Sequence, residues 1–392
     1  MSYPGSDAVA ANSAIEWTTH TFNPWEGCSK VSPGCAHCYA ESRAGRYGSS
    51  KWGPNGTRVV RSEAYWRGPL KWNREAAWCG NPVCKAAAMG RAGGRCACGL
   101  AVERPRVFVA SLADVFEDWQ GKMVDARGER LYYPMNSWED RRPWVPISEC
   151  GGEEKPITMG TVRKRLFDLI DATLNLDWLL LTKRPQNIWD LTPGTGWVDA
   201  EHRAWPVREN VWFGTSVENQ AAADERIPHL MKVPAAVRFL SMEPLLGPVD
   251  LGSWYTIAEF RRLIAEDVAR GHYDPERLRL IQDPHTFETI GSEEELLPGL
   301  HWVIAGGESG HGARPMHPLW ARQVRDQCQA AGVPFFFKQW GEWGPGARCD
   351  HPKADYYWFQ PDGTLVSRFG KKAAGRLLDG QEFSGFPTTG VA

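Results

Sequence analysis

Six short runs of branched and aromatic residues are spaced along the chain, and most of them end in polar turn residues. Each run is nearly continuous in apolar residues, which is typical of strands covered on both faces, as in a parallel sheet. The pattern therefore predicts a parallel sheet. The six runs are RVFVASLAD (106–114), LDWLLLTKRP (176–185), NVWFGTSVEN (210–219), VRFLSMEPL (237–245), HWVIAGGESG (301–310) and VPFFFKQWGEW (333–343).

Amphipathic helical patterns lie between several of these runs. Residues 161–174 place apolar side chains on one face, with Thr161 as the expected N-cap. Residues 319–332 carry a second apolar stripe that ends at Gly332, a common stop signal. Strand–helix alternation over this length predicts an α/β fold, namely a (βα) barrel, partial or complete and TIM-like. Six or seven strands can be counted, so closure into eight stays open.

Three segments interrupt the alternation and are interpreted as insertions into one barrel of residues 1–345. The last of them contains an amphipathic helix from Tyr255 to Arg270. Beyond the barrel, a hairpin is predicted around Pro361, Asp362 and Gly363, so residues 346–392 form a C-terminal extension. The three insertions are 74–104, 119–156 and 252–299.

Composition narrows the class of protein. The chain has 392 residues, of which 42% are hydrophobic and 23% charged, as in a soluble globular enzyme. No run is long enough to span a bilayer, and the first residues lack the features of a signal peptide, so a cytoplasmic location and no membrane partner are expected. The net charge of −2 disfavours a module that grips duplex DNA through its phosphates alone.

Polar side chains follow each predicted strand, where the catalytic groups of a parallel barrel lie. Six such ends in succession, several with both acidic and basic groups, are hard to explain by packing. The paired glycines of AGGESG let a ligand approach the backbone, and the glutamate beside them can accept a hydrogen bond. We expect one cavity to be lined by Asp114, Lys183, Ser216, Glu218, Glu243 and Glu308, unless these residues pair with each other as a structural ion network.

Cys28, Cys35 and Cys38 lie within eleven residues. In a reducing compartment such a cluster more often binds metal than forms a disulfide. Three thiolates do not complete a structural zinc site, whereas a [4Fe–4S] cluster on three cysteines leaves one iron open for another ligand. The spacing favours the iron–sulfur cluster, and zinc or an inert role stays open. We expect the three sulfurs to converge.

A second cysteine group lies in the first insertion. Four thiolates in two close pairs, in a segment too short to have its own core, fit a structural zinc site. Cys79, Cys84, Cys96 and Cys98 are therefore predicted to hold zinc; whether they hold a second cluster instead stays open.

Six ordered blocks, between Ile15 and Phe386, together resemble the phage-associated three-Cys-motif proteins, a family of unknown function. That family is similar to a divergent branch of the radical S-adenosylmethionine (SAM) enzymes, of the DNA-photolesion-lyase type. The first cysteine gap is six residues here instead of the usual three, and Gly306–Glu308 come late in the chain. The blocks are IEWTTHTFNPWEGCSKVSPGCAHCYAE, LLLTKRPQNI, WFGTSVENQ, FLSMEPLLGPV, WVIAGGESG and GKKAAGRLLDG.

The resemblance implies a [4Fe–4S] cluster on the first three cysteines and SAM on the open iron. One-electron reduction would generate a 5′-deoxyadenosyl radical that modifies or repairs a nucleobase or related substrate. It implies a nucleic-acid or nucleotide substrate, an electron donor, a partner protein encoded nearby and, for a phage protein, the cytoplasm of the bacterial host. Trp212 or Trp340 would cover the adenine. The expected catalytic residues are Asp114, Lys183, Glu218 and Glu243, and the expected cofactor-binding residues are Ser216, Gly306, Gly307, Glu308 and Lys338.

Two other functions remain open. One is a zinc-dependent barrel hydrolase or nuclease in which Asp114, Glu218 and Glu243 perform acid–base chemistry, although no HxH or HExxH spacing is present. The other is a non-catalytic phage interaction protein whose cysteines only hold loops together.

Overall fold

The structure is a computed structural model that describes most of the predicted barrel. The second cysteine group (Cys79, Cys84, Cys96 and Cys98) and the predicted helix from Tyr255 to Arg270 lie outside the described residues. The described residues are 13, 15–46, 52–76, 104–133, 145–146, 156–193, 208–251, 299–347 and 355–387.

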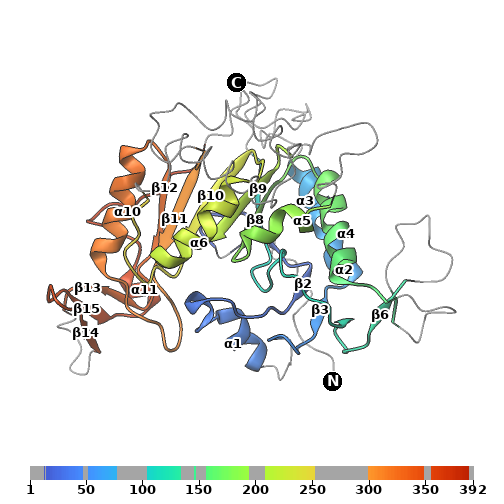
Figure 1. The fold of residues 1–392 in the computed structure, drawn as a ribbon, viewed down its shortest axis with the longest axis horizontal. Helices are drawn as coiled ribbons and strands as arrows, with labels where there is room; N and C mark the ends of the chain where they lie inside the picture. The colour runs from blue at the N-terminus through green and yellow to red at the C-terminus, as the bar shows by residue number, and fades with distance from the viewer. Residues whose placement is uncertain are drawn as a thin grey trace, which may run out of the picture.

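Seven parallel strands form the main sheet, and their order in space follows their order in the chain. All six predicted strands are confirmed, and β1 precedes them. Because each strand is added beside the previous one, the sheet curls in one direction into a half-barrel (Figure 1). No described strand joins β1 to β12, so the described residues form a half-barrel, and a complete barrel is not shown. The strands are β1 (His20–Phe22), β4 (Arg106–Val109), β8 (Asp177–Thr182), β9 (Val211–Ser216), β10 (Val237–Met242), β11 (Trp302–Gly306) and β12 (Phe335–Gln339).

Helices connect the strands, as the alternation predicts. The predicted helix 161–174 is α4 (Met159–Asp171), but its N-cap is Thr158, not Thr161. Thr161 takes the third helical position, where its hydroxyl and that of Thr158 exchange hydrogen bonds with each other's backbone N–H in a capping box. The second predicted helix is α10, which ends just before Gly332 (φ +67°). Helix α10 spans Pro318–Ala330, and the remaining helices of the described residues are α1 (Tyr39–Arg46), α2 (Glu63–Trp66), α3 (Gly68–Ala76), α5 (Ile188–Leu191), α6 (Gln220–Met231), α11 (Lys371–Ala374), η1 (Pro33–Cys35) and η3 (Pro185–Asn187).

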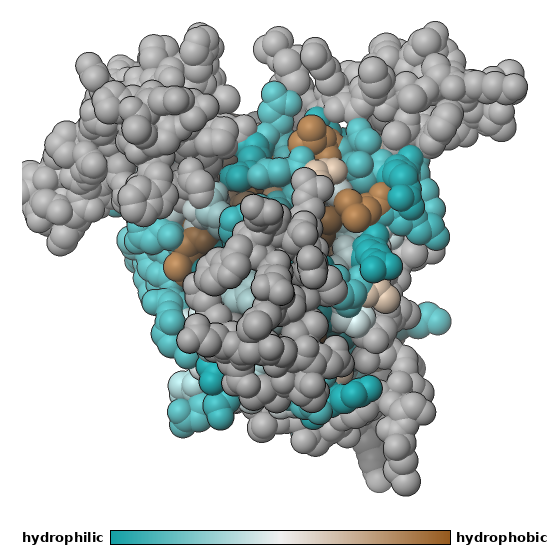
Figure 2. Space-filling model, turned by 90° about the vertical axis from the view of Figure 1, so that its right-hand side faces the viewer, coloured by the Kyte–Doolittle hydropathy of each residue, from teal (hydrophilic) through white to brown (hydrophobic). Residues whose placement is uncertain are grey.

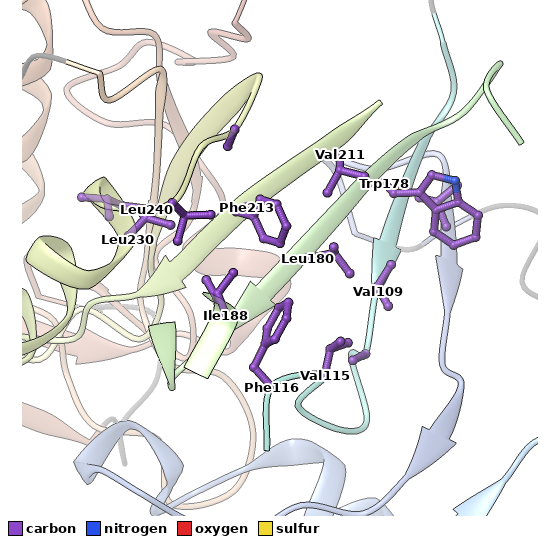
Figure 3. Packing of buried hydrophobic residues seen from close by; sticks show 14 of the residues in the cluster. Val109, Val115, Phe116, Trp178, Leu180, Ile188, Val211, Phe213, Leu230 and Leu240 are labelled. Carbon is purple, nitrogen blue, oxygen red and sulfur yellow. The ribbon is translucent and has the colours of Figure 1, made fainter. Parts of the chain in front are cut away.

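Both faces of the sheet are apolar, which explains the near-continuous runs in the sequence. On one face, Phe213 and Leu240 pack against Ile188 of α5 and Leu230 of α6 (Figure 3). The alternate residues form a second cluster rich in aromatic rings, with Trp302 at its centre. Because successive strand residues point to opposite faces, every position in such a strand is buried.

The chain after β12 forms a separate small sheet and then returns to the main sheet. The predicted hairpin is confirmed as β14 (Tyr356–Trp358) and β15 (Leu365–Arg368), which pair with β13 (Trp343–Pro345) in a small antiparallel sheet next to α10 (Figure 1). Residues 383–386 then run along the edge of β12, where Phe337 donates to the carbonyl of Phe383. This segment covers backbone groups that an edge strand would otherwise leave open.

Short strands and loops complete the described fold. A three-stranded sheet brings the segment before the first cysteine next to residues 58–60 and 123–124. On the face that carries α2 to α4, the described surface is mostly hydrophilic with separate small hydrophobic spots (Figure 2). No helix in the described ranges is both long and apolar enough to cross a bilayer. The short strands are β2 (Trp25–Glu26), β3 (Arg58–Val60), β5 (Met123–Val124), β6 (Leu131–Tyr132) and β7 (Val145–Pro146).

Candidate functional site

A cavity of about 730 Å³ opens at the carboxyl ends of the parallel strands. Its wall contains all three clustered cysteines and residues from the ends of all seven strands. Seven of the nine predicted non-cysteine site residues line it, whereas Glu218 and Gly306 lie behind the wall. The seven are Asp114, Lys183, Ser216, Glu243, Gly307, Glu308 and Lys338.

Residues 28–38, which we call the Cys loop, lie across this cavity. Cys28, Cys35 and Cys38 are free thiols and all three line the cavity. No group of three or more His, Cys, Asp and Glu side chains in the described part of the chain is arranged to hold a metal ion, and the convergence of the three sulfurs around a larger cluster stays a prediction. Two of the sulfurs have neighbours of their own, since the Cys28 thiol lies 3.4 Å from the Ser29 carbonyl and the Cys35 sulfur 3.9 Å from the Ser32 hydroxyl.

The beginning of the Cys loop is fixed at Ser29. Its N–H donates to Oε1 of Glu117 (2.9 Å), and its carbonyl accepts from Arg184 (2.7 Å). Arg58, fully buried, donates to the Ser29 hydroxyl and to both oxygens of Glu117. The N–H, carbonyl and hydroxyl of Ser29 are therefore each bonded to a buried charged side chain.

Asp114 is bonded to residues at the end of β8, so its carboxylate is already occupied by partners within the protein. Its oxygens accept from the Thr182 hydroxyl (2.7 Å) and from Arg184 (2.8 Å). The same guanidinium lies 3.7 Å from the Cys28 sulfur. Burial, with the charges of Asp114 and Glu117, raises the pKa of the Cys28 thiol to about 12, against the opposing effect of Arg184. Without a positive ion at the sulfur, Cys28 is a neutral thiol.

Glu218, at the end of β9, touches the middle of the Cys loop. It is almost fully buried, forms an ion pair with Arg226 of α6 (2.8 Å) and accepts from the Gly34 N–H (3.3 Å). Burial opposes its ionisation, but Arg226 and the Ser32 hydroxyl hold its pKa below the ordinary value. Glu218 is thus an ionised carboxylate turned toward the loop.

Glu308, after β11, makes the corresponding contact with the second half of the loop. Arg314 donates to both of its oxygens, at 2.7 and 2.8 Å, and reaches on to the Pro33 carbonyl (3.0 Å). The imidazole of His37 lies 3.2 Å from the same carboxylate. Despite its burial, these donors hold the pKa of Glu308 below its ordinary value.

Glu243, after β10, and Lys338 of β12 form an ion pair, with the ammonium 3.1 and 3.2 Å from the two carboxylate oxygens. Their side chains retain 14% and 18% of their exposure, so both reach the cavity. Neither forms a hydrogen bond or ion pair with the described residues of the Cys loop, unlike Glu218 and Glu308. Ser241 and Ser216, both buried, lie beside them in the lining.

The two glycines of the AGGESG segment are explained by the neighbouring strand. A Cβ at Gly307 would lie 1.9 Å from the backbone oxygen of Trp340, and one at Gly306 would lie 2.9 Å from a carboxylate oxygen of Glu243. Gly307 therefore needs glycine for packing, which a ligand-based interpretation of the sequence did not foresee, whereas at Gly306 the flexible Glu243 side chain can shift.

Aromatic residues form the floor of the cavity, but not the two that were expected. Trp17 and Phe108, from the second apolar cluster, line it. Trp212 and Trp340 are instead packed in the core, 2% and 3% exposed, and are absent from the lining. Tyr39 lies at the rim, 58% exposed, with its hydroxyl bonded to the Ser111 carbonyl (2.6 Å).

The lining is positively charged, although the chain carries −2. Its carboxylates are three, Asp114, Glu243 and Glu308, and each forms an ion pair. Its basic residues are Arg43, Arg61, Lys183, Arg184, Lys338 and Lys371. Of these, Arg43, Lys183 and Lys371 have no ion-pair partner among the described residues.

The sequence interpretation did not include several of the residues that organise this site. Arg226 and Arg314 complete the two carboxylate contacts, and Glu117 with Arg58 fixes the start of the loop. A signal was present in two cases, since an arginine follows each strand-end glutamate eight and six positions later.

The described chain was compared with known proteins. A family model described as "Protein of unknown function (DUF5131)" matches residues 12–127 and 121–387. A search of curated proteins gave no match. A solved structure, "Spore photoproduct lyase complexed with dinucleoside spore photoproduct", is similar over 91% of this chain and 70% of that one, with 13% identity and a TM-score of 0.32. Similarity at this level is too low to transfer a function.

Proposed function

We propose that this chain, which belongs to the DUF5131 family of proteins of unknown function, is a radical-SAM-like iron–sulfur enzyme. Its substrate would be a nucleobase within a phosphate-bearing molecule, which it modifies or repairs. The observation that supports this most is that three thiols of one loop share a cavity with polar residues from the carboxyl ends of seven parallel strands. Catalytic sites of barrel-like folds lie at this edge.

Cys28, Cys35 and Cys38 would hold a [4Fe–4S] cluster. Soft thiolate ligands suit such a cluster better than a hard divalent cation. Arg184, beside Cys28, is placed to offset the charge of a bound thiolate. When bound, the cluster would supply the electron for reductive cleavage of SAM.

Lys338 and Glu243 would bind the methionine part of SAM. This part carries a carboxylate and an amino group, which match an ammonium and a carboxylate that already lie side by side. Of the four residues expected to be catalytic, Asp114, Glu218 and Glu243 have partners in the protein, which leaves Lys183 for chemistry at the substrate.

The substrate would be recognised through its phosphates. Arg43, Lys183 and Lys371 leave positive charge in the cavity, and such charge raises the local concentration of anions. Tyr39 and Arg43 are one helical turn apart on α1, so both lie on one face. A base stacked on the exposed ring of Tyr39 would bring its phosphate toward Arg43.

Anaerobic reconstitution with iron and sulfide tests this proposal. We expect about four iron and four sulfide per chain, a reducible cluster by electron paramagnetic resonance, and SAM binding by calorimetry. Cys35→Ala should abolish the cluster, whereas Cys328→Ala, in a buried thiol of α10, should retain it. Protein that binds zinc and no iron at the Cys loop would contradict the proposal and favour a zinc-dependent hydrolase.

The substrate class needs a separate measurement. A 5′-phosphorylated thymidine dinucleotide should bind the reconstituted protein more tightly than thymidine, and its affinity should fall steeply with salt. Equal affinities for the two, independent of salt, would exclude phosphate recognition.

A further inference from the structure

We infer that Glu218 and Glu308 are positioning residues that pin two stretches of the Cys loop to the strand ends, and are not ligand-binding groups. This inference rests on the proposed function for its purpose, since a loop that carries three cluster ligands has to be held in place. The geometry behind it is independent of any cluster.

Glu218 holds the middle of the loop. Its carboxylate is 1% exposed and is therefore closed to a ligand in the cavity, whereas the Gly34 N–H and the Ser32 hydroxyl both reach it. The close approach depends on glycine, because a Cβ at Gly34 would lie 3.1 Å from the carboxyl group. Arg226 balances the negative charge from behind, at 2.8 Å.

Glu308 holds the second half through two routes. His37 contacts it directly, and Arg314 bridges it to the Pro33 carbonyl. Pro33 and Cys35 bound the single turn of η1, so this bridge fixes the turn that carries the second cysteine. His37 precedes the third cysteine, so the same carboxylate also constrains that end.

Glu218 follows β9 and Glu308 follows β11, so the ends of two strands hold the loop. Together with the bonds at Ser29, they attach the loop at residues 29, 32–34 and 37, so each cysteine lies within one or two positions of an attachment. Side chains that bind a cofactor are effective only when their own support is rigid. Charge-assisted hydrogen bonds to buried carboxylates are well suited to this, because they are strong and directional.

Glu243 provides a matched control. It is also a glutamate just beyond a parallel strand of the same sheet, it lines the same cavity, and it forms its own ion pair. It differs from Glu218 and Glu308 in that its partner is Lys338, on β12, and not the loop.

Hydrogen–deuterium exchange on the metal-free full chain tests the inference. In Glu218→Gln, we expect the Gly34 amide to exchange at least tenfold faster; in Glu308→Gln and Arg314→Gln, we expect the same for amides of residues 35–38. The amides of β8 and β9 should stay within twofold of wild type in all three variants. Glu243→Gln should leave the loop unchanged. Alkylation of Cys35 and Cys38 by iodoacetamide should accelerate in parallel with exchange.

Two results would overturn the inference. One is loop exchange that is unchanged in all three variants. The other is exchange that rises equally in the loop and in β8 and β9, because that pattern reports general destabilisation. Arg314→Lys keeps the positive charge but loses the bridge to Pro33, so its loop should exchange as fast as in Arg314→Gln. Loop exchange in Arg314→Lys at the wild-type rate would also contradict a positioning role.

These experiments distinguish a failure of the positioning inference from a failure of the proposed function. If the wild-type chain assembles no cluster while Glu218→Gln and Glu308→Gln free the loop, the proposed function fails and the positioning role stands. If the cluster forms and SAM binds, but Glu308→Gln weakens SAM binding more than tenfold with loop exchange unchanged, Glu308 is a ligand-binding residue and the inference fails.

Discussion

Glu308 and His37 lie 3.2 Å apart, from Oε2 to Nδ1, although 271 positions separate them in the chain. The contact joins the end of β11 to the residue before the third clustered cysteine. A strand-end carboxylate that the sequence suggests as a cofactor ligand is therefore bonded to the loop that carries the cysteines. Four predictions follow from this and other contacts, and each has its own measurement.

Acid should release the Cys loop. Glu218 and Glu308 have pKa values below the ordinary 4.5, so their ionised forms stabilise the folded state. Their contribution is fully present above the unfolded pKa of 4.5 and is lost as the pH falls through their lower folded values. We expect the free energy of unfolding by urea to fall between pH 5 and pH 3 less steeply in Glu218→Gln/Glu308→Gln than in wild type. Parallel slopes would refute this.

Gly307→Ala should destabilise the protein because its Cβ would meet the backbone oxygen of Trp340, which cannot move aside like a side chain. The expected cost is about 3 kcal/mol, measured by urea unfolding. Gly160→Ala is the control: in α4 its nearest neighbour would be 3.6 Å away, so alanine should stabilise by ~0.5–1 kcal/mol. A Gly307→Ala variant as stable as wild type would mean that the two strands separate more easily than their contact suggests.

Trp302→Phe should loosen the segment after α11 from the sheet. The indole N–H of Trp302 donates to the Gly385 carbonyl (2.7 Å), and its ring packs on Phe386 at 5.2 Å between centroids. Phenylalanine keeps most of the packing and loses the hydrogen bond, at a cost of ~1–3 kcal/mol. Faster proteolysis near residues 383–387 checks this. Trp358→Phe, at a 58% exposed position, should change stability by less than ~0.5 kcal/mol.

Lys338→Gln should weaken SAM binding to the reconstituted protein at least tenfold, because an ammonium that pairs with a carboxylate in the cavity is removed. Lys372→Gln is the control, since Lys372 is exposed on α11 and does not line the cavity. Calorimetry measures both. Equal affinities in the two variants would remove Lys338 from the proposed site.

The sequence predicts the strands well because their signal is local. Each apolar run, such as 176–185 or 210–219, is buried on both faces and became a parallel strand. The strand β1 was harder to identify, because its three residues HTF carry too few apolar side chains to form a run. The N-cap of α4 was misplaced by three residues, since two threonines in a capping box carry the same local signal.

The site was predictable only in outline. Strand ends in a parallel sheet meet at one edge, so the shared cavity follows from topology. The ion-pair partner of each charged group does not follow from topology. Arg314 reaches Glu308 from a loop, and Arg226 reaches Glu218 from helix α6, so both pairs depend on the path of the chain after the strand. The reason for Gly307 also lies in another strand, in the position of the Trp340 carbonyl.

The attachments of the Cys loop also set an order of events during synthesis. Residues 28–38 leave the ribosome early, but their partners at positions 184, 218, 308 and 314 follow roughly 150 to 280 residues later. Until then the described attachments hold the loop only at Ser29, through Arg58 and Glu117, and its thiols are open to oxidants and to stray metal ions. If the loop holds the proposed cluster, metal loading would follow translation of β11, and the nascent chain would need a reducing environment until then.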